Sequence, residues 1–276
     1  EAIESYEKSL GILKKTLPEN HPDLTTSYNN IGLVYNSMGE YSKALEYYGK
    51  SLEIMKKALP QDHPSLATSY NNIGSVYTRM GEYSEALEYY EKSLEIMKKT
   101  LPENHPDLAT TYNNIGLVYD SMGEYSEALE YYEKSLGILK KTLPANHPSL
   151  ATSYNNIGSV YTRMGEYSEA LEYYGKDLEI MKKALHENHP LLATSYNNIG
   201  LVYNSMGEYS KALEYYGKSL EISKKALPEN HPSLATSYNN IGFVYTSMGE
   251  YSEALGYFDR ALDIWQLSLP SNHPNI

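Results

Sequence analysis

The chain has 276 residues, with 23 Lys and Arg against 35 Asp and Glu for a formal net charge of -12, and it contains no cysteine. The lack of cysteine excludes disulfide bonds and thiolate chemistry, and the acidic balance argues against nucleic acid, whose phosphates require clustered Lys and Arg. No apolar run approaches the ~20 residues that span a bilayer and no secretory signal opens the sequence, so we expect no membrane contact and a cytoplasmic location.

The sequence repeats itself every 42 residues. Tyr-Asn-Asn-Ile-Gly begins at Tyr28 and recurs at this spacing up to Tyr238, and Met-Gly-Glu-Tyr-Ser and His-Pro follow the same period. A fixed period of roughly 20–50 residues is typical of a solenoid, in which each unit buries its apolar face against its neighbours. We therefore expect a single repeat array over residues 1–276, with a partial unit at 1–20, full units at 21–62, 63–104, 105–146, 147–188, 189–230 and 231–272, and the start of another unit at 273–276.

Each full unit predicts two helices. In the first one, apolar residues after Pro22 are spaced by three or four and share one helical face, at Leu24, Tyr28, Ile31, Tyr35 and Met38. Gly39 stands where a helix end often needs a left-handed residue. The second helix is predicted from Ala44 to Leu59 and ends before Pro60, whose ring disfavours helical geometry in the preceding residue. Its outer surface carries favourable i,i+4 pairs, Glu46 with Lys50 and Glu53 with Lys57.

The two ends of the sequence fall inside repeats. Glu1 aligns with Lys43, so the sequence opens at a second helix, and it closes as another unit begins. We count seven second helices and six first helices, which predicts 13 helices and indicates an excerpt of a longer array. The last second helix departs from the others, with Trp265 where Met55 stands in the first unit.

The repeat pattern resembles the tetratricopeptide repeat. The signature positions of that family are matched in the first full unit by Tyr28, Ile31, Gly32, Tyr35, Ala44, Tyr48 and Ser51. The usual family period is ~34 residues, and this longer unit, with Asn-Asn before the aliphatic residue and His-Pro at its start, is similar to the kinesin light chain type. The resemblance implies an all-α, right-handed superhelical solenoid whose first helices line a concave groove that holds extended peptides.

Differences between the copies gather on the side of the first helix opposite its packing face. The first variable position reads Leu33, Ser75, Leu117, Ser159, Leu201 and Phe243. The second reads Asn36, Thr78, Asp120, Thr162, Asn204 and Thr246. The third reads Ser37, Arg79, Ser121, Arg163, Ser205 and Ser247. The copies alternate over most of the chain, which a ligand surface would show, although exposed positions also drift freely because they contribute little stability.

An asparagine ladder is the best candidate for recognition. Its members are Asn30, Asn72, Asn114, Asn156, Asn198 and Asn240. A side-chain amide both donates and accepts, so it can pair with a peptide backbone without reading its sequence. The alternative is that these amides only bridge adjacent helices, a role that favours the neighbouring Asn29 series. With the exposed Leu33, Leu117, Leu201 and Phe243 and the two cations Arg79 and Arg163, the ladder predicts a peptide-binding surface for polar and apolar sequences.

Histidines precede proline at the start of each unit, one repeat apart, and therefore cannot converge on one metal ion. We interpret them as residues that start helices, and expect no metal, no cofactor and no enzymatic activity. The predicted function is a non-catalytic scaffold that binds a protein or peptide ligand. Two alternatives stay open: a spacer or sensor arm of a larger signalling protein, and an array that self-associates end to end.

Overall fold

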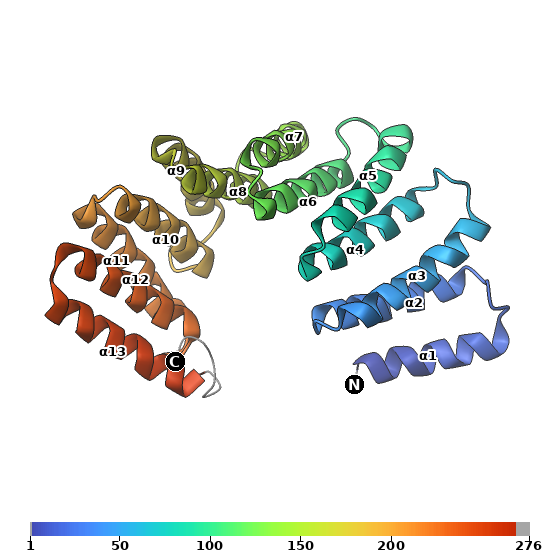
Figure 1. Ribbon diagram of the computed structural model, residues 1–276, viewed down its shortest axis with the longest axis horizontal. Coiled ribbons are helices and arrows are strands. Elements are labelled where there is room, and N and C mark those ends of the chain that lie inside the picture. Colours follow the sequence, from blue (N-terminus) through green and yellow to red (C-terminus); the bar gives the residue numbers. More distant parts are fainter. Residues whose placement is uncertain (1, 269–276) are drawn as a thin grey trace. The chain divides into compact units, whose positions relative to one another are not determined.

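A computed structural model describes residues 2–268, which form thirteen α-helices (Figure 1). Six are first helices: α2 (Asp23–Ser37), α4 (Pro64–Met80), α6 (Pro106–Met122), α8 (Pro148–Met164), α10 (Pro190–Ser205) and α12 (Pro232–Met248). Seven are second helices: α1 (Ala2–Thr16), α3 (Tyr41–Ala58), α5 (Tyr83–Thr100), α7 (Tyr125–Thr142), α9 (Tyr167–Ala184), α11 (Tyr209–Ala226) and α13 (Tyr251–Ser268). The predicted all-α repeat fold and its number of helices are confirmed for this part of the chain.

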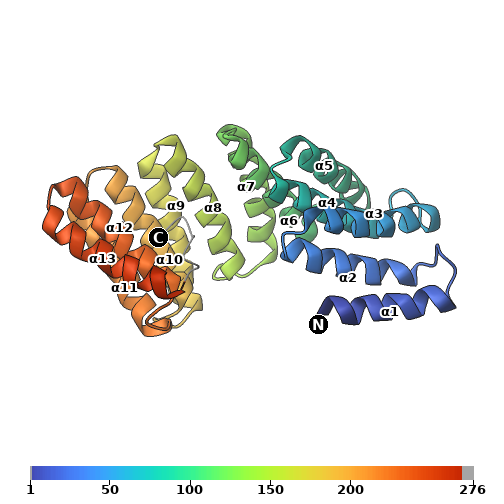
Figure 2. The ribbon, with the colours of Figure 1, turned by 60° about the horizontal axis from the view of Figure 1, so that its bottom comes forward.

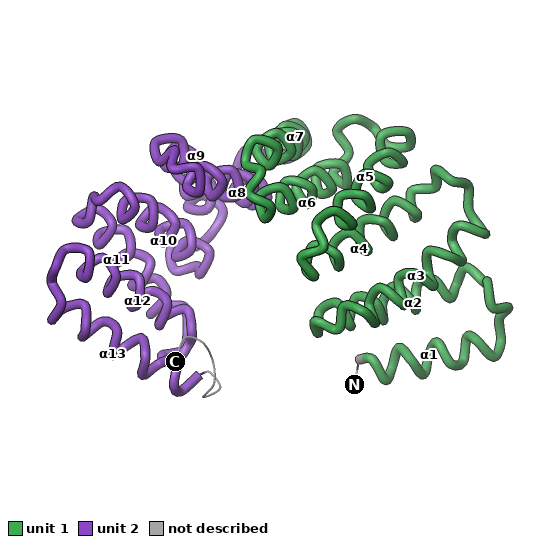
Figure 3. Tube along the Cα trace, in the orientation of Figure 1, with its two compact units in different colours: residues 1–142 green, residues 143–276 purple. Residues whose placement is uncertain are grey.

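The chain divides into two compact units, residues 1–142 and 143–276 (Figure 3). In the first unit, α1 packs against α2, and the hairpins α2–α3, α4–α5 and α6–α7 follow one another. The second unit contains the hairpins α8–α9, α10–α11 and α12–α13. Within each unit the two helices of a hairpin lie side by side, and each second helix also packs on the first helix of the next hairpin (Figure 2).

Local chemistry sets the bounds of the first helices. At the start of α4, His63 is extended, its Nδ1 accepts a hydrogen bond of 3.2 Å from the Ser65 backbone N–H, and Pro64 occupies the first helical position. Proline is well placed there because the first helical N–H has no partner within the helix. Gly81 ends the helix with a φ of +79°, a left-handed conformation that glycine adopts without steric cost. A histidine Nδ1 accepts an equivalent backbone hydrogen bond at the start of α2, α6, α8, α10 and α12. This confirms the interpretation of these histidines as helix-start residues.

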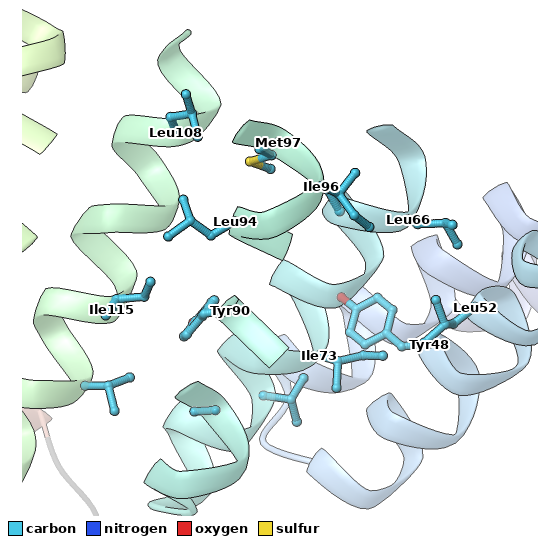
Figure 4. Close-up of a cluster of buried hydrophobic side chains, with 14 of the residues drawn as sticks. Tyr48, Leu52, Leu66, Ile73, Tyr90, Leu94, Ile96, Met97, Leu108 and Ile115 are labelled. Carbon is cyan, nitrogen blue, oxygen red and sulfur yellow. The ribbon is translucent and has the colours of Figure 1, made fainter. Parts of the chain in front are cut away.

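An aromatic ring of the second helix lies directly on a glycine of the first helix in every hairpin; it is a tyrosine in five hairpins and Phe258 in the last one. In the second hairpin a Cβ added to Gly74 would lie 2.9 Å from Cε1 of the buried Tyr90, closer than ordinary contacts allow. Leu94, Ile73 and Ile115 continue this apolar core within the first unit (Figure 4). The glycine is therefore required for helix approach and not for a turn.

Three further tyrosines form a seam along the same hairpin. Tyr89 stacks on Tyr77 with ring centroids 5.5 Å apart, and it meets Tyr70 at 6.1 Å in a tilted arrangement. Equivalent trios recur in all six hairpins with nearly the same distances. Offset and tilted ring pairs of this kind add roughly 0.5–1.5 kcal/mol beyond area burial. The high tyrosine content is thus a packing device, as its helical spacing predicts.

Ion pairs cover the outer surface of the second helices. Lys92 binds Glu88 at 2.5 Å and Lys99 binds Glu95 at 2.6 Å, both four residues apart on α5. The Lys99 ammonium holds the pKa of the Glu95 carboxyl below its usual value through this hydrogen bond. The predicted pairs are present, but because they are exposed their contribution to stability is small.

The last second helix, α13, packs in the second unit with Trp265 half-buried against a cluster that includes Leu234, Tyr238 and Ala261. Residues 273–276, which the sequence assigns to a further repeat, lie outside the described residues.

Candidate functional site

The predicted recognition residues lie on one side of the first helices, which we call the first-helix face. In the first full repeat this face consists of Thr26, Asn29, Asn30, Leu33 and Ser37, and in the other repeats of their equivalents. Because these positions are three or four residues apart, the helix brings them onto one stripe facing away from Ile31 and Tyr28, which are buried in the core. The equivalent stripes of α2, α4 and α6 belong to the first unit, and those of α8, α10 and α12 to the second.

The asparagine ladder forms hydrogen bonds between successive first helices. Asn114 Nδ2 donates to Asn71 Oδ1 at 3.4 Å in the first unit. In the second unit Asn198 donates to Asn155 at 2.7 Å, and Asn240 donates to Asn197 at 2.8 Å. The Asn30 series therefore bridges repeats together with the Asn29 series, whereas the sequence favoured the Asn29 series for that role.

Each amide pair keeps hydrogen-bonding capacity after this bond is made. A primary amide has two N–H donors and an acceptor oxygen, and the bond between Asn240 and Asn197 uses one donor of the former and the acceptor of the latter. The Asn240 oxygen and the Asn197 amino group remain on the same half-buried surface, one accepting and one donating. A peptide group offers the complementary C=O and N–H, so the pair has the chemistry to hold one.

The amide–amide hydrogen bond is missing between the first two first helices, α2 and α4. Asn29 Oδ1 is buried and receives no hydrogen bond, and Asn72 makes none to it. An unsatisfied buried amide oxygen costs about 1–3 kcal/mol, so this junction is less well satisfied than those that follow.

Exposed apolar side chains stand beside the amides. Leu33, Leu117, Leu201 and Phe243 are 57%, 45%, 44% and 53% exposed, although leucine and phenylalanine are usually buried. In the intervening repeats Ser75 and Ser159 occupy this position and are half-buried. The first unit therefore presents two leucines separated by one serine repeat, and the second presents a leucine next to a phenylalanine, as the sequence predicts.

The two predicted cations, Arg79 and Arg163, do not form a continuous row of basic side chains. Arg79 is exposed on α4, and its Nη1 donates to the Asn36 backbone oxygen at 3.5 Å, at the C-terminal end of the preceding first helix. Arg163 is exposed on α8. The Asn36 carbonyl already accepts the Gly39 backbone N–H at 3.2 Å, so Arg79 adds a second donor to it.

In five of the six repeats the second variable position is not part of the exposed surface, contrary to the expectation from the helical wheel; only Thr246 is exposed. Asn36 and Asp120 are buried, and Thr78, Thr162 and Asn204 are half-buried. In the second hairpin Thr78 donates to the Gly74 carbonyl at 2.9 Å, and its oxygen lies 3.3 Å from the hydroxyl of the buried Tyr90. Alternation at this position therefore follows internal hydrogen bonding and carries no evidence for a ligand.

The buried tyrosine hydroxyls respond to this alternation. Burial raises the pKa of Tyr48 and of Tyr216 to about 12 in repeats that carry asparagine at the second variable position. In the second hairpin burial also raises the pKa of Tyr90, but hydrogen bonds from Thr78 and Ser75 oppose that rise. The signal was present in the sequence, because Thr and Ser alternate together at the two positions that face the tyrosine.

Among the described side chains no three His, Asp or Glu residues are grouped so that they could hold a metal ion. Within residues 2–268, none of the helices combines the length and the apolar character that a membrane span requires. The first-helix face offers amides, hydroxyls and apolar groups, which suit recognition of another chain.

Comparison with known proteins agrees with this architecture. The sequence matches the model of the tetratricopeptide repeat family over residues 1–57, 65–141, 149–225, 196–267 and 233–276. No curated protein sequence matches the chain. Among solved structures it is similar to a Podosopora anserina putative kinesin light chain with nearly identical TPR-like repeats, at 27% identity and a TM-score of 0.65, over 75% of this chain and 99% of that chain.

Two more distant structures share the fold alone. BtubC (BKLC) from P. vanneervenii is 22% identical with a TM-score of 0.66, over 89% of this chain and 93% of that chain. Aspartyl phosphate phosphatase F from Bacillus subtilis is 16% identical with a TM-score of 0.66, over 91% of this chain and 74% of that chain. The repeated helical hairpins and the family match over most of the sequence lead to one conclusion: the chain belongs to the tetratricopeptide repeat family, and the solved structures similar to it include kinesin light chain-like repeats.

Proposed function

We propose that the chain is a non-catalytic scaffold that binds an extended peptide, or a helix of a partner protein, along its first-helix face. Repeats of this family generally mediate protein–protein interactions. The observation that carries the proposal is the row of exposed Leu33, Leu117, Leu201 and Phe243 beside half-buried asparagine pairs. Apolar side chains that remain exposed next to unused amide groups on rigid helices provide both burial and hydrogen bonding for a ligand.

The two kinds of residue have different roles in this proposal. An amide pair binds main chain, and each such hydrogen bond contributes about 0.5–1.5 kcal/mol, so several repeats must act together for useful affinity. The exposed leucines bind side chains and select sequence, because burying a leucine stabilises a complex by about 1.5–3 kcal/mol when it was fully exposed before. Each leucine here is about half exposed, so we expect roughly 1 kcal/mol from each one.

A displayed library of unstructured peptides, selected against the full chain, tests this function. The affinity of the selected peptides is then measured for wild type and for the double variant Leu33→Ser and Leu117→Ser. We expect binding to weaken by about thirtyfold, the equivalent of roughly 2 kcal/mol, with little change in melting temperature because both side chains are exposed.

Ile12→Ser is the matched control in the same unit. Ile12 is 64% exposed but lies on α1, a second helix, away from the first-helix face. The control should leave affinity unchanged. Selection of no peptide at all would contradict the proposal and favour the alternative of a spacer or sensor arm. Equal losses in the control and the double variant would show that the peptides bind exposed apolar groups without regard to the face.

A further inference from the structure

One position on the second helices differs in the last-but-one repeat. It is occupied by a large apolar residue in every repeat but one, and reads Leu13, Met55, Met97, Leu139, Met181, Ser223 and Trp265. Met55 and Met97 are buried, and each accepts a hydroxyl hydrogen bond on its sulfur from the next first helix, from Ser69 at 3.3 Å and from Thr111 at 3.5 Å. The methionine therefore fills the junction between its own helix and the first helix of the next repeat.

Ser223 leaves this junction unfilled in the second unit. A cavity of about 290 Å³ lies between α10, α11 and α12, and its walls include Ala193, Asn197, Ser219, Ser223, Leu227 and Ser237. The equivalent place in the first unit, where Met55 is present, holds a cavity of about 210 Å³ lined by Pro22, Leu59 and His63. The larger cavity also reaches Ser219 and Ser237. The equivalent residues of the first unit, Ser51 and Ser69, do not line the smaller cavity.

The walls of the larger cavity hold an unused hydroxyl. Ser223 is 4% exposed, and its hydroxyl has no hydrogen-bond partner among the described residues. Its neighbours are satisfied, since Ser219 donates to the Ala193 carbonyl at 2.7 Å and Ser237 donates to the Ser233 carbonyl at 3.1 Å. Unlike the buried oxygens of Asn29 and Asp177, the Ser223 oxygen is not fully enclosed, so water or a ligand in the cavity can complete its hydrogen bonding.

The cavity opens onto the first-helix face. Its rim includes the exposed Thr194 and Thr236, and Asn197, which accepts the ladder bond from Asn240 at 2.8 Å. No Asp, Glu, Lys or Arg lines it. A side chain that enters from a peptide on this face must therefore be uncharged, because an unpaired charge is strongly disfavoured in such a site.

The geometry points to a side-chain pocket between α10 and α12 that binds a methionine of a partner peptide. In other repeats the chain's own Met55 and Met97 occupy this place. The side chain of a partner methionine would occupy it beside Ser223. The hydroxyls of Ser69 and Thr111 donate to the methionine sulfurs there, and Ser223 offers a donor here. An unbranched thioether also adapts to irregular cavities. This inference rests on the proposed function, because it assigns a specificity pocket to the same binding face.

The pocket is tested on the full chain with N-acetyl-methionine methylamide as the probe, followed by amide chemical shifts in NMR titrations. We expect saturable shifts at Ser219, Ser223 and Ser237, weaker binding of the norleucine analogue by about two- to tenfold because it lacks an acceptor, and no binding of the glutamate analogue. Ser223→Met should abolish the shifts at Ser219 and Ser237, since the methionine then closes that part of the cavity, as Met55 does in the first unit.

Two further variants keep the test decisive. Ser223→Ala retains the space without the hydroxyl, so methionine and norleucine probes should bind it equally. Met181→Ser should create a second pocket at the α9–α10 junction, where Met181 is buried now. Shifts that persist in Ser223→Met would show that the probe binds elsewhere, and their absence in wild type would show a water-filled packing gap only; either result would overturn the proposal. That failure is distinguishable from failure of the proposed function, because the leucine double variant tests peptide binding in the other unit.

Discussion

Asp177 makes the second unit sensitive to pH. It stands on α9 at the position that serine occupies in most other repeats, and it is 2% exposed. There the serine hydroxyl donates to a backbone carbonyl of the preceding first helix, as Ser93 does to Ala67 at 2.8 Å and Ser219 does to Ala193 at 2.7 Å. An ionised aspartate has no proton to donate, and Asp177 Oδ1 is buried with no hydrogen-bond partner.

Burial raises the pKa of Asp177 from an ordinary value of 3.8 to about 6, although a hydrogen bond with Ser195 opposes this rise. The folded state therefore binds a proton more tightly than the unfolded chain does. The stability from this proton is complete below pH 3.8, falls as pH rises towards 6, and is lost above that. A pKa shift of about two units is worth about 3 kcal/mol, since one unit corresponds to 1.36 kcal/mol.

Asp177→Ser should remove this penalty. We expect the variant to exceed wild type in unfolding free energy by about 3 kcal/mol at pH 7, and to lose most of that advantage by pH 4. Urea unfolding followed by far-ultraviolet circular dichroism, at pH values from 4 to 8, measures the difference. The other carboxyl groups titrate in both proteins, so their effects cancel in the comparison.

Asp177→Asn separates charge from size. It keeps the shape of aspartate but does not ionise, so its stability relative to the serine variant should be independent of pH. A stability difference between wild type and Asp177→Ser that stays constant from pH 4 to 8 would refute the reasoning, because it would mean that Asp177 ionises as readily in the folded state as in the unfolded chain.

Three further predictions concern packing and capping. Gly116→Ala should destabilise the chain by about 1–3 kcal/mol in urea unfolding, because the added Cβ would lie 2.8 Å from the Tyr132 ring, whereas Gly137→Ala on the open side of α7 should stabilise it by about 0.5–1 kcal/mol. If Gly116→Ala left the free energy of unfolding unchanged, the Tyr132 ring would have to move aside freely. His105→Ala should lower the melting temperature through loss of the α6 cap, worth about 1 kcal/mol, and an unaltered melting curve would remove the cap's role. Asn240→Ala should cost about 1 kcal/mol by leaving the Asn197 oxygen without its donor, and a neutral result would show that this ladder bond does not stabilise the junction.

The fold follows from the sequence because each repeat carries its own signals. Pro at the first helical position, Gly at +79° after α4, and Pro after the second helix are local requirements that periodicity places correctly. Six repetitions of the same pattern then remove the ambiguity that a single helix would leave.

The candidate site follows only in part. Exposure of Leu33 and Leu117 is predicted by the helical wheel, because it depends on direction around one helix. The bond of Asn114 to Asn71 and the burial of Asn36 depend on how neighbouring repeats approach, and one helix considered alone gives no information about that. The hydrogen bond of Tyr90 with Thr78 was not predicted, because the two residues lie on different helices; the joint alternation of Thr and Ser was the only sign of it in the sequence.

Trp265 is the chain's single tryptophan, and it sits in the terminal helix among partners from its own end of the second unit. Its emission, excited at a wavelength that tyrosine does not absorb, reports the melting of that hairpin alone, while circular dichroism averages over all thirteen helices. In an array stabilised by nearest neighbours, the gap between the two midpoints measures how far cooperativity extends along the chain. Coincident midpoints would indicate a domain that melts as a whole, and an early fluorescence change would indicate fraying from the end.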